Sequence, residues 1–491
     1  MVGIGSKFVK AGYETYKSFN EIRGETLLSY AIKPFPKDFT KYVIIGKNNL
    51  SDADQKRLLE IDNVRVITID GHTNGPGYSI YMARDHLPQN ESFFITYCDI
   101  FWTWNYADVE ALLDYDGIVF TRKSFSPHLI DNNFSAFCLP SKEQPLKLQQ
   151  LREKGHFTDK WMDEPLSVGT FYVKNGADMF EALRTMINDN ERVNNEFYPS
   201  MIFNYLIQSG KEIRMHDVDF FIHWGEPNSY EDVKQWIQID KLESNKEIVS
   251  HSHQNICCMG GLGERMKSQS NKPKALIDTE GLPMYQHVLS KFACAQNTII
   301  TVDHLIPQIK NQTSPVQYDV YGVGEQTSSQ IETLQRAIDF LTTQKNFYLT
   351  SCDAYGYYDE VKFDKYIQVN DPDIILFAFQ PTWLQRRCKM NHTYMTTEGS
   401  RVKAIHVKNK MNETDKGLAG FFWFKDGAVF EALDSFQFNQ ERECIVDDYL
   451  KYLLEGKIKV HCYDLDYYVH LGSVYEYQEY LFWKQYGRVF K

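Results

Sequence analysis

The chain has 491 residues, and its content of 43% hydrophobic and 14% aromatic residues predicts buried cores rather than disorder. Lysine and arginine together number 53 against 65 aspartates and glutamates, so the net charge of −12 argues against nucleic acid as a partner. The nine cysteines show no metal-binding spacing, the N-terminus does not resemble a signal segment, and no apolar run approaches the ~18 residues of a membrane span. We therefore expect a cytoplasmic protein that does not bind a membrane.

Short apolar runs alternate with segments of helical spacing along the first half of the chain. Strands are expected at 42–46, 64–69 and 93–97, with helices at 52–60 and 79–87. The second half repeats the alternation, with strands expected at 256–259, 297–302, 347–351 and 373–379. Alternation of this kind predicts an α/β fold in which helices cover a mixed, mainly parallel sheet.

Several segments occur twice in the sequence. Residues 168–183 resemble 418–433, and residues 217–225 resemble 464–472. This repeat of about 250 residues is far longer than the ~20–50 residues of a solenoid unit, so it predicts a tandem duplication of a whole Rossmann-like domain. Pairing of the two halves within the chain is compatible with such a duplication. The predicted domains are 1–242 and 255–491, joined by a linker at 243–254.

A glycine-rich segment follows the first strand of the second half. Residues 260–266 read G-G-L-G-E-R-M, and Lys274 follows a few positions later. Glycines allow backbone N–H groups to approach a phosphate closely. Arg265 adds a planar guanidinium suited to phosphate oxygens, and Lys274 adds a second cation. An ordinary strand–helix turn with a solvated arginine and lysine is the simpler alternative.

This segment resembles the nucleotidylyltransferase (pyrophosphorylase) family, which makes nucleotide-sugars from an NTP and a sugar phosphate. The family pattern is G-x-G-x-R followed by P-K, matched here by Gly261, Gly263, Arg265, Pro273 and Lys274. The resemblance implies an NTP and a phosphorylated sugar or similar small molecule as partners, and Mg²⁺ as the cofactor.

The same resemblance implies a role for each matching residue of the second half. The implied roles are NTP phosphate binding by Gly260, Gly261, Gly263 and Arg265, contact with the reacting phosphates by Lys274, Mg²⁺ binding by Asp353, and contact with the base by Thr327 and Ser329. For Asp353, a simple turn or helix-capping role is the alternative.

The first half resembles the family through a more divergent set of residues. The matching positions are Gly3, Gly5, Lys7, Lys17, Gly75 and Asp99. Lys7 stands where the family has arginine, and a lysine cannot reproduce the bidentate contacts of a guanidinium. Met1 lies within the glycine loop, so the strand expected before that loop is missing: either the start lies further upstream, or this half lacks a central strand.

Both halves depart from the family near their ends. The family has an aspartate there that is the second Mg²⁺ ligand, whereas this chain has His223 and His470. Histidine is a poor ligand for Mg²⁺, which prefers oxygen. Asp219 and Asp466 lie four residues earlier on the same strand face and are candidate replacements. Buried, hydrogen-bonded structural histidines are the alternative interpretation.

Three functions remain open from the sequence. The first is a nucleotidylyltransferase that joins an NTP to a sugar phosphate or similar phosphate and releases pyrophosphate, with one, both or neither copy active. The second is an inactive protein that binds a nucleotide or nucleotide-sugar. The third is a GT-A-type glycosyltransferase, which would normally carry D-x-D where this chain has C-D at Asp99 and Asp353.

Overall fold

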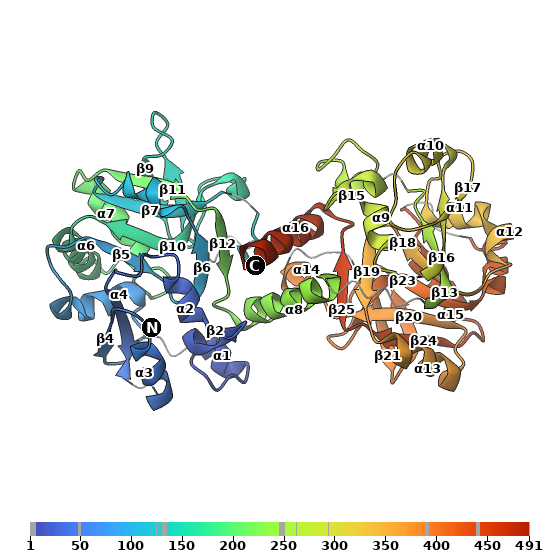
Figure 1. Cartoon of the computed structure of the whole chain (residues 1–491), viewed down its shortest axis with the longest axis horizontal. Helices are drawn as coiled ribbons and strands as arrows, with labels where there is room; N and C mark the ends of the chain where they lie inside the picture. Colours follow the sequence, from blue (N-terminus) through green and yellow to red (C-terminus); the bar gives the residue numbers. More distant parts are fainter. Residues whose placement is uncertain are drawn as a thin grey trace. The chain divides into compact units, whose positions relative to one another are not determined.

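In the computed structural model, the chain forms two compact units, Met1–Lys234 and Gln235–Lys491 (Figure 1). The structure describes all residues except 1–5, 48–50, 124, 130–134, 245–250, 262, 293, 388–391, 438–441 and 491. The division falls within one helix, α8 (Pro227–Ser244), shortly before the predicted boundary at residue 242. The predicted linker 243–254 overlaps the end of α8 and the beginning of strand β13 (His251–Cys258).

The main sheet of unit 1 is mixed, in the order β11-β7-β10-β8-β9, with β5 also paired to β10. Its strands are β5 (Phe93–Thr96), β7 (Gly117–Arg122), β8 (Phe137–Pro140), β9 (Leu148–Arg152), β10 (Leu166–Val173) and β11 (Ile213–Asp217). Only β11 and β7 pair in parallel within this sheet; the other pairs are antiparallel. All eight residues of β10 are buried, as expected for a strand with neighbours on both sides.

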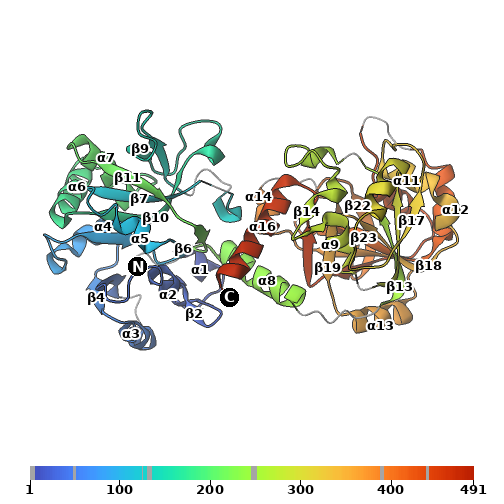
Figure 2. The same ribbon diagram turned by 45° about the horizontal axis from the view of Figure 1, so that its top comes forward.

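Three helices cover this sheet: α4 (Pro76–Met82), α6 (Gly176–Asn188) and α7 (Ile202–Gln208). Figures 1 and 2 show α6 and α7 side by side. Helix α6 begins where the Asn175 side chain accepts a hydrogen bond from the N–H of Ala177. Its buried Met179, Leu183 and Met186 recur at helical spacing and therefore form one apolar face toward the core.

The remaining elements of unit 1 form small pairs and short helices. Strands β3 (Lys41–Gly46) and β4 (Val64–Ile69) make a parallel pair that, with α3 (Asp52–Leu59), lies below the main sheet in Figures 1 and 2. Strands β6 (Ile100–Thr103) and β12 (Phe220–His223) make an antiparallel pair. The others are β1 (Glu21–Ile22), β2 (Glu25–Thr26), α1 (Ser6–Lys10), α2 (Leu27–Ile32) and α5 (Tyr106–Glu110).

Unit 2 contains one nine-stranded sheet in the order β17-β16-β13-β18-β23-β20-β24-β22-β21. Besides β13, its strands are β16 (Cys294–Thr301), β17 (Asp319–Gly322), β18 (Lys345–Ser351), β20 (Ile374–Phe379), β21 (Tyr394–Glu398), β22 (Arg401–His406), β23 (Lys416–Asp426) and β24 (Val460–Asp464). The antiparallel pairs β14 (Asp278–Thr279) with β15 (Leu282–Pro283) and β19 (Ala354–Tyr357) with β25 (Tyr467–His470) lie outside it.

Besides the end of α8, the described part of unit 2 contains several helices. They are α9 (Met284–Leu289), α10 (Ile306–Lys310), α11 (Gln330–Arg336), α12 (Ile338–Leu341), α13 (Glu360–Asn370), α14 (Trp383–Arg387), α15 (Val446–Leu454) and α16 (Val474–Val489). The core joins buried residues of β13, β16, β18, β20 and β23 to those of α11 and α15. Within the described residues, no helix of the chain is long and apolar enough to cross a membrane.

The expectation of a mainly parallel sheet is not confirmed in either unit. In unit 2, strands β17, β16, β13 and β18 are parallel neighbours, and β20 is parallel to β24. Strand β23 separates these two groups because it pairs antiparallel with both β18 and β20. The apolar pattern of β23 does not reveal this direction, since a strand buried on both faces reads as the same apolar run either way.

The two units differ at the strand that precedes the glycine loop. In unit 2, β13 lies between β16 and β18 and pairs in parallel with both. Among the described residues of unit 1, β3 pairs only with β4 and β5 only with β10, so no strand joins β3 to β5. All four residues of β5 remain partly exposed, whereas residues 347–350 of β18 are buried. The place of a central strand is therefore unfilled in the described part of unit 1.

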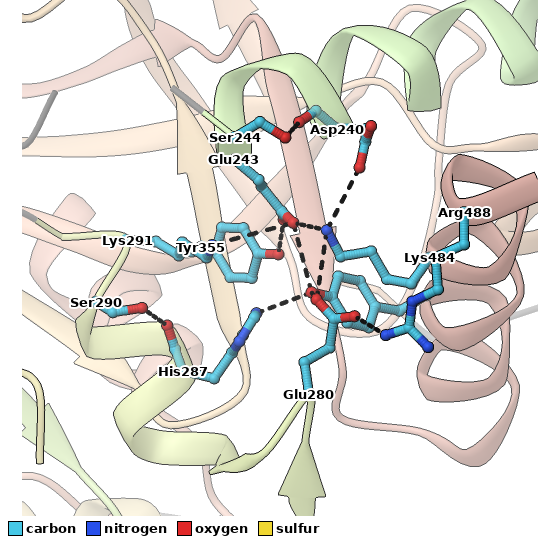
Figure 3. Close-up of polar contacts among 11 residues, drawn as sticks. Asp240, Glu243, Ser244, Glu280, His287, Ser290, Lys291, Tyr355, Lys484 and Arg488 are labelled. Atoms are coloured by element: carbon cyan, nitrogen blue, oxygen red, sulfur yellow. Dashed lines mark hydrogen bonds and ion pairs between the residues drawn. The ribbon is translucent and has the colours of Figure 1, made fainter. Parts of the chain in front are cut away.

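Ionised side chains within unit 2 tie the end of α8 to α16 (Figure 3). Lys484 forms an ion pair with Glu243, and its Nζ lies 3.4 Å from Glu280 Oε2. The Glu243 side chain is only 3% exposed and also accepts a hydrogen bond from the Tyr355 hydroxyl at 2.5 Å. Breaking a buried ion pair costs about 3–5 kcal/mol, so this cluster holds the second half of α8 firmly within unit 2. Burial lowers the pKa of the neighbouring His287 to about 4, so that imidazole stays neutral.

Candidate active site

A cavity of about 360 Å³ opens in unit 2 beside the carboxyl ends of β13 and β18. Open α/β sheets bind their ligands at this end of the strands. The cavity brings together most of the residues predicted for unit 2. Its lining includes Gly260, Gly261, Gly263, Arg265, Lys274, Asp353 and His470.

The glycine loop needs glycine at two positions for packing reasons. Gly263 has φ +64°, and a Cβ there would lie 2.7 Å from the Cβ of Lys274. A Cβ on Gly260 would lie 2.6 Å from the Thr333 hydroxyl oxygen. A Cβ on Gly261, by contrast, would meet nothing within 4 Å, so open space borders the loop there. Arg265 is exposed on the short 3-10 turn that follows the loop.

Lys274 and Asp353 form a buried ion pair on the cavity wall. The distance from Lys274 Nζ to Asp353 Oδ2 is 2.6 Å, and the Asp353 side chain is 5% exposed. Burial by itself disfavours both charges, but the pairing offsets it: the pKa of Lys274 is raised and that of Asp353 is lowered. Both groups are therefore ionised at neutral pH. A lysine held in this way is placed to meet a negatively charged ligand that enters the cavity.

His470 lies between two carboxylates at the end of β25. Its Nδ1 is 2.5 Å from Glu476 Oε2, and its Nε2 is 3.8 Å from Asp353 Oδ2. Burial by itself would lower the pKa of His470, but the two carboxylates raise it. Glu476 also lies 3.2 Å from Nε2 of His392, which lines the same cavity. These contacts extend the Lys274–Asp353 pair into a buried charged network.

The structure does not bring Thr327 and Ser329 to the cavity lining. The Thr327 hydroxyl donates to the carbonyl of Gly260, and the Ser329 hydroxyl caps α11 by accepting from the N–H of Glu332. Both side chains thus satisfy buried backbone groups, which are costly to leave unpaired. The neighbouring Ser328 and Gln330 line the cavity instead.

Asp466 does not reach Asp353, contrary to the sequence expectation. In the β19–β25 pair, His470 lies opposite Ala354, whereas Asp466 lies beyond Tyr357 and is exposed. Four residues of extended strand span about 13 Å at ~3.3 Å per residue. Asp466 is therefore too far along the chain from His470 to share a cation with Asp353.

A second set of polar groups lies on the lining of the same cavity. Lys408, Thr393 and Asp447 line it, with Lys408 in a left-handed backbone conformation at φ +52°. Burial raises the pKa of Asp447 to about 6, although Thr393 and the nearby Lys408 oppose the shift. The sequence offered little to single out Asp447, because it is one of two adjacent acids in the first turn of α15.

Unit 1 repeats the central pair of this site. Lys17 Nζ lies 2.6 Å from Asp99 Oδ2, and a short antiparallel strand pair, here β6 with β12, places His223 opposite Ile100, directly after Asp99. A Cβ on Gly225 would lie 2.3 Å from Asp99 Oδ2, as a Cβ on Gly472 would from Asp353 Oδ2. Despite burial, the pairing raises the pKa of Lys17 and lowers that of Asp99.

Other predicted residues of unit 1 do not gather around Asp99. Lys7 forms an ion pair with Glu226. Gly75 begins α4 with φ +92°, where a Cβ would lie 2.7 Å from Glu196 Cβ, so its role is close packing. Asp219 is exposed, and its backbone N–H donates to the carbonyl of Thr103, at the end of the β6–β12 strand pair that is remote from Asp99. Gly3 and Gly5 lie outside the described residues.

Whether Asp353 or Asp99 can bind a metal ion depends on the other possible ligands nearby. Among the described residues, no group of three or more His, Cys, Asp and Glu side chains could hold a metal ion. Mg²⁺ does not require such a group, because it is often held by one or two carboxylates together with substrate phosphates. Asp353, on the wall of the cavity, is suited to that form of binding.

No family model and no curated protein matches the chain. Solved structures match about half of it. A nucleoside-diphosphate-sugar pyrophosphorylase from Vibrio cholerae RC9 is 22% identical over 47% of this chain and 96% of its own, with a TM-score of 0.40. An inositol-1-phosphate CTP transferase from T. maritima is 13% identical over 48% and 95%, with a TM-score of 0.38. A UDP-glucose pyrophosphorylase complexed with UDP-glucose is 13% identical over 48% and 99%, with a TM-score of 0.40.

These similar structures are sugar-phosphate nucleotidyltransferases, the family that the sequence motifs resemble. At identities of 22% or less and TM-scores of 0.40 or less, we draw no conclusion about function from the likeness. The residues of the site have to carry that conclusion.

Proposed function

We propose that unit 2 is a nucleotidylyltransferase that joins an NTP to a sugar phosphate or similar small phosphate and releases pyrophosphate. The Lys274–Asp353 pair carries this proposal, because it lies beside a glycine loop in one cavity. The backbone N–H groups of the loop and the ammonium of Lys274 can bind phosphates, and the carboxylate of Asp353 can bind a metal ion. A wall built from such groups suits a polyphosphate better than a neutral ligand.

In the proposed reaction, an oxygen of the acceptor phosphate attacks the α-phosphorus of the NTP. A bond forms between that oxygen and the α-phosphorus, while the bond from the α-phosphorus to the bridging oxygen breaks. The electron pair leaves with pyrophosphate. Arg265 binds the β- and γ-phosphates, and Lys274 stabilises the charge that develops on the transferred group. The protein contributes position and charge rather than a covalent nucleophile.

The proposed cofactor is a divalent cation, Mg²⁺ in the expectation from the sequence, held by Asp353 and the NTP phosphates. Such a cation neutralises phosphate charge during the transfer. The ionised state of Asp353, maintained by Lys274, keeps the carboxylate ready for this role.

The acceptor is proposed to bind beside Lys408 and Asp447 in the same cavity. Lys408 supplies a cation there for its phosphate, and Asp447 supplies a carboxyl group that can accept hydrogen bonds from sugar hydroxyls. This arrangement supports a hydroxylated phosphate as the acceptor.

For unit 1 we propose a tandem copy that binds a nucleotide or nucleotide-sugar without transferring it. Its Lys17–Asp99 ion pair and its antiparallel strand pair β6–β12 match the Lys274–Asp353 pair and the strands β19–β25 of unit 2, which supports the duplication. Its Lys7 is paired with Glu226, whereas the matching Arg265 of unit 2 lines the cavity. This difference favours binding over catalysis.

The test is pyrophosphate release by the whole chain, with every pair from a panel of NTPs and sugar phosphates plus Mg²⁺. Asp353→Asn is expected to reduce release by more than about 100-fold, whereas the matched change Asp99→Asn leaves it within about threefold. Equal losses in both variants, or a loss in Asp99→Asn alone, would contradict the assignment to unit 2. If no pair releases pyrophosphate while nucleotide still binds, the protein is a binding protein and the proposal is wrong.

A further inference from the structure

One imidazole nitrogen of His470 faces the carboxylate of Asp353 across the cavity wall. The separation from Nε2 to Asp353 Oδ2 is 3.8 Å. The antiparallel pairing of β19 with β25 sets this placement, because it puts His470 opposite Ala354, directly after Asp353. Metal bonds to imidazole nitrogen and carboxylate oxygen are each ~2.1 Å long, so one ion can bridge atoms up to ~4.2 Å apart. The observed separation lies within this span.

The other nitrogen of His470 is held by a carboxylate that is itself fixed. Glu476 lies in the first turn of α16 with its side chain 2% exposed. Its Oε2 lies 2.5 Å from His470 Nδ1 and accepts a bond from the Ser473 hydroxyl at 2.7 Å, while Oε1 accepts from Gln385 Nε2 at 3.0 Å. Histidines that bind metals usually donate their second ring N–H to a carboxylate in this way, which directs the free nitrogen to the metal.

Gly472 keeps a side chain out of the space between Asp353 and His470. A Cβ on Gly472 would lie 2.3 Å from Asp353 Oδ2 and 2.7 Å from His470 Nε2. A side chain there would therefore occupy the space between the two candidate ligands. Lys274 Nζ now lies 2.6 Å from Asp353 Oδ2, and incoming phosphates give that ammonium further oxygens to pair with.

We propose that His470 Nε2 and Asp353 together bind a first-row transition-metal dication such as Co²⁺ or Mn²⁺, in preference to Mg²⁺. Mg²⁺ binds oxygen and accepts nitrogen poorly, whereas the affinity of imidazole sites rises from Mn²⁺ through Co²⁺ toward Cu²⁺. Phosphate oxygens complete the coordination, and in this respect the inference rests on the proposed function. Glu476 is a positioning residue that orients the ring.

Unit 1 offers an internal comparison for this inference. His223 ends β12, in the equivalent antiparallel pair β6–β12. Six residues later stands Ser229, at the same spacing as Glu476 from His470. The Ser229 hydroxyl donates to the backbone carbonyl of Glu226. The carboxylate that fixes the ring in unit 2 thus has no counterpart at this position, and we assign the transition-metal site to unit 2 alone.

The test measures metal binding directly, by calorimetry and by the visible absorption of Co²⁺, in the presence of inorganic pyrophosphate. The wild-type chain is expected to bind Co²⁺ at least tenfold more tightly than Mg²⁺. His470→Ala is expected to weaken Co²⁺ binding by about 10- to 100-fold and to shift the absorption spectrum, while Mg²⁺ binding stays within about threefold. His470→Asp is expected to strengthen Mg²⁺ binding, since it supplies a second oxygen ligand.

Matched variants separate ligation from folding. His304→Ala, at an exposed histidine of unit 2, is expected to leave Co²⁺ binding unchanged. Glu476→Gln keeps the size of the side chain and is expected to weaken Co²⁺ binding by about 10-fold or more. Circular dichroism checks that each variant is folded. Unchanged Co²⁺ affinity and spectrum in a folded His470→Ala, or equal competition by Mg²⁺, would overturn the inference.

The two proposals fail in different ways. Co²⁺ bound through His470 without pyrophosphate release from any NTP would leave the metal site and refute the transferase. Pyrophosphate release with Mg²⁺, together with Co²⁺ binding that ignores His470, would leave the transferase and refute the metal site.

Discussion

Units 1 and 2 share a lysine–aspartate pair but differ in almost everything around it. Lys17 and Asp99 are held at the same 2.6 Å as Lys274 and Asp353, and each aspartate directly precedes a short strand whose antiparallel partner ends at a histidine. In unit 2, the glycine loop and Arg265 lie in the same cavity as this pair, and Glu476 holds the histidine. The comparison teaches that the same charged pair can lie in two different surroundings, so the pair by itself does not define the proposed site.

The sheets of the two units also differ. Strand β13 joins β16 to β18 in unit 2, and the glycine loop follows it directly. In the described part of unit 1, β3 and β5 have no strand between them.

The largest expected effect is on stability when the lysine of either pair is removed. Lys274→Met should lower the free energy of unfolding of unit 2 by about 3–5 kcal/mol, because it leaves Asp353 buried and unpaired. Lys17→Met should cost less, since the Lys17 and Asp99 side chains are 25% and 12% exposed, against 19% and 5% for the pair in unit 2. Urea denaturation measures both. A larger loss in Lys17→Met would break the comparison.

The next effect concerns the two cations of the glycine loops. Arg265→Ala should reduce the kcat/KM of pyrophosphate release by about 100-fold, or about 2.7 kcal/mol of transition-state stabilisation. Lys7→Ala should change it by less than about threefold, because Lys7 is paired with Glu226. Steady-state kinetics on the pair of variants checks this. Turnover by Arg265→Ala within a few-fold of the wild type would remove Arg265 from the proposed mechanism.

Hydrogen–deuterium exchange sharpens the difference between the sheets. Backbone amides of β3 and β5 should exchange at least about tenfold faster than those of β16 and β18, since strands with an unpaired edge open more easily. Mass spectrometry of peptides from these strands gives the rates in one experiment. Equal protection would mean that β3 and β5 are as well paired as their counterparts.

The smallest effect distinguishes the two histidines by the sign of their pH dependence. The pKa of His470 is raised in the folded state by its carboxylates, so its contribution to stability is present below about pH 6.5 and lost as the pH rises through the folded value. Burial lowers the pKa of His223, although Asp99 opposes the shift. Its penalty therefore appears below about pH 6.5 and is relieved above it.

The measurement is the free energy of unfolding between pH 5.5 and 8.5, compared with His470→Ala and His223→Ala. Each replacement should remove a pH dependence of about 1 kcal/mol or less, with opposite signs for the two variants. The same sign in both would contradict the different surroundings of the two rings.

Part of the fold and of the site could be predicted because it depends on local pattern. Apolar runs located the strands β18 and β20, and the order of glycines, arginine and lysine located the loop that borders the cavity. The resemblance implied separate roles for Lys274 and Asp353, and neither it nor their spacing predicted that the two side chains form an ion pair. The direction of β23 could not be predicted, since burial on both faces hides it.

The sequence by itself determined which residue types lie at the ends of β13 and β18, because a strand carries whatever follows it to one edge of the sheet. Only the tertiary structure decided which side chains turn inward. Thr327 and Ser329 bond to backbone groups, and Asp466 lies too far along its strand. Glu476 reaches His470 because α16 begins directly behind β25. Such contacts depend on distances between elements that are far apart in the chain, and local sequence patterns do not reveal those distances.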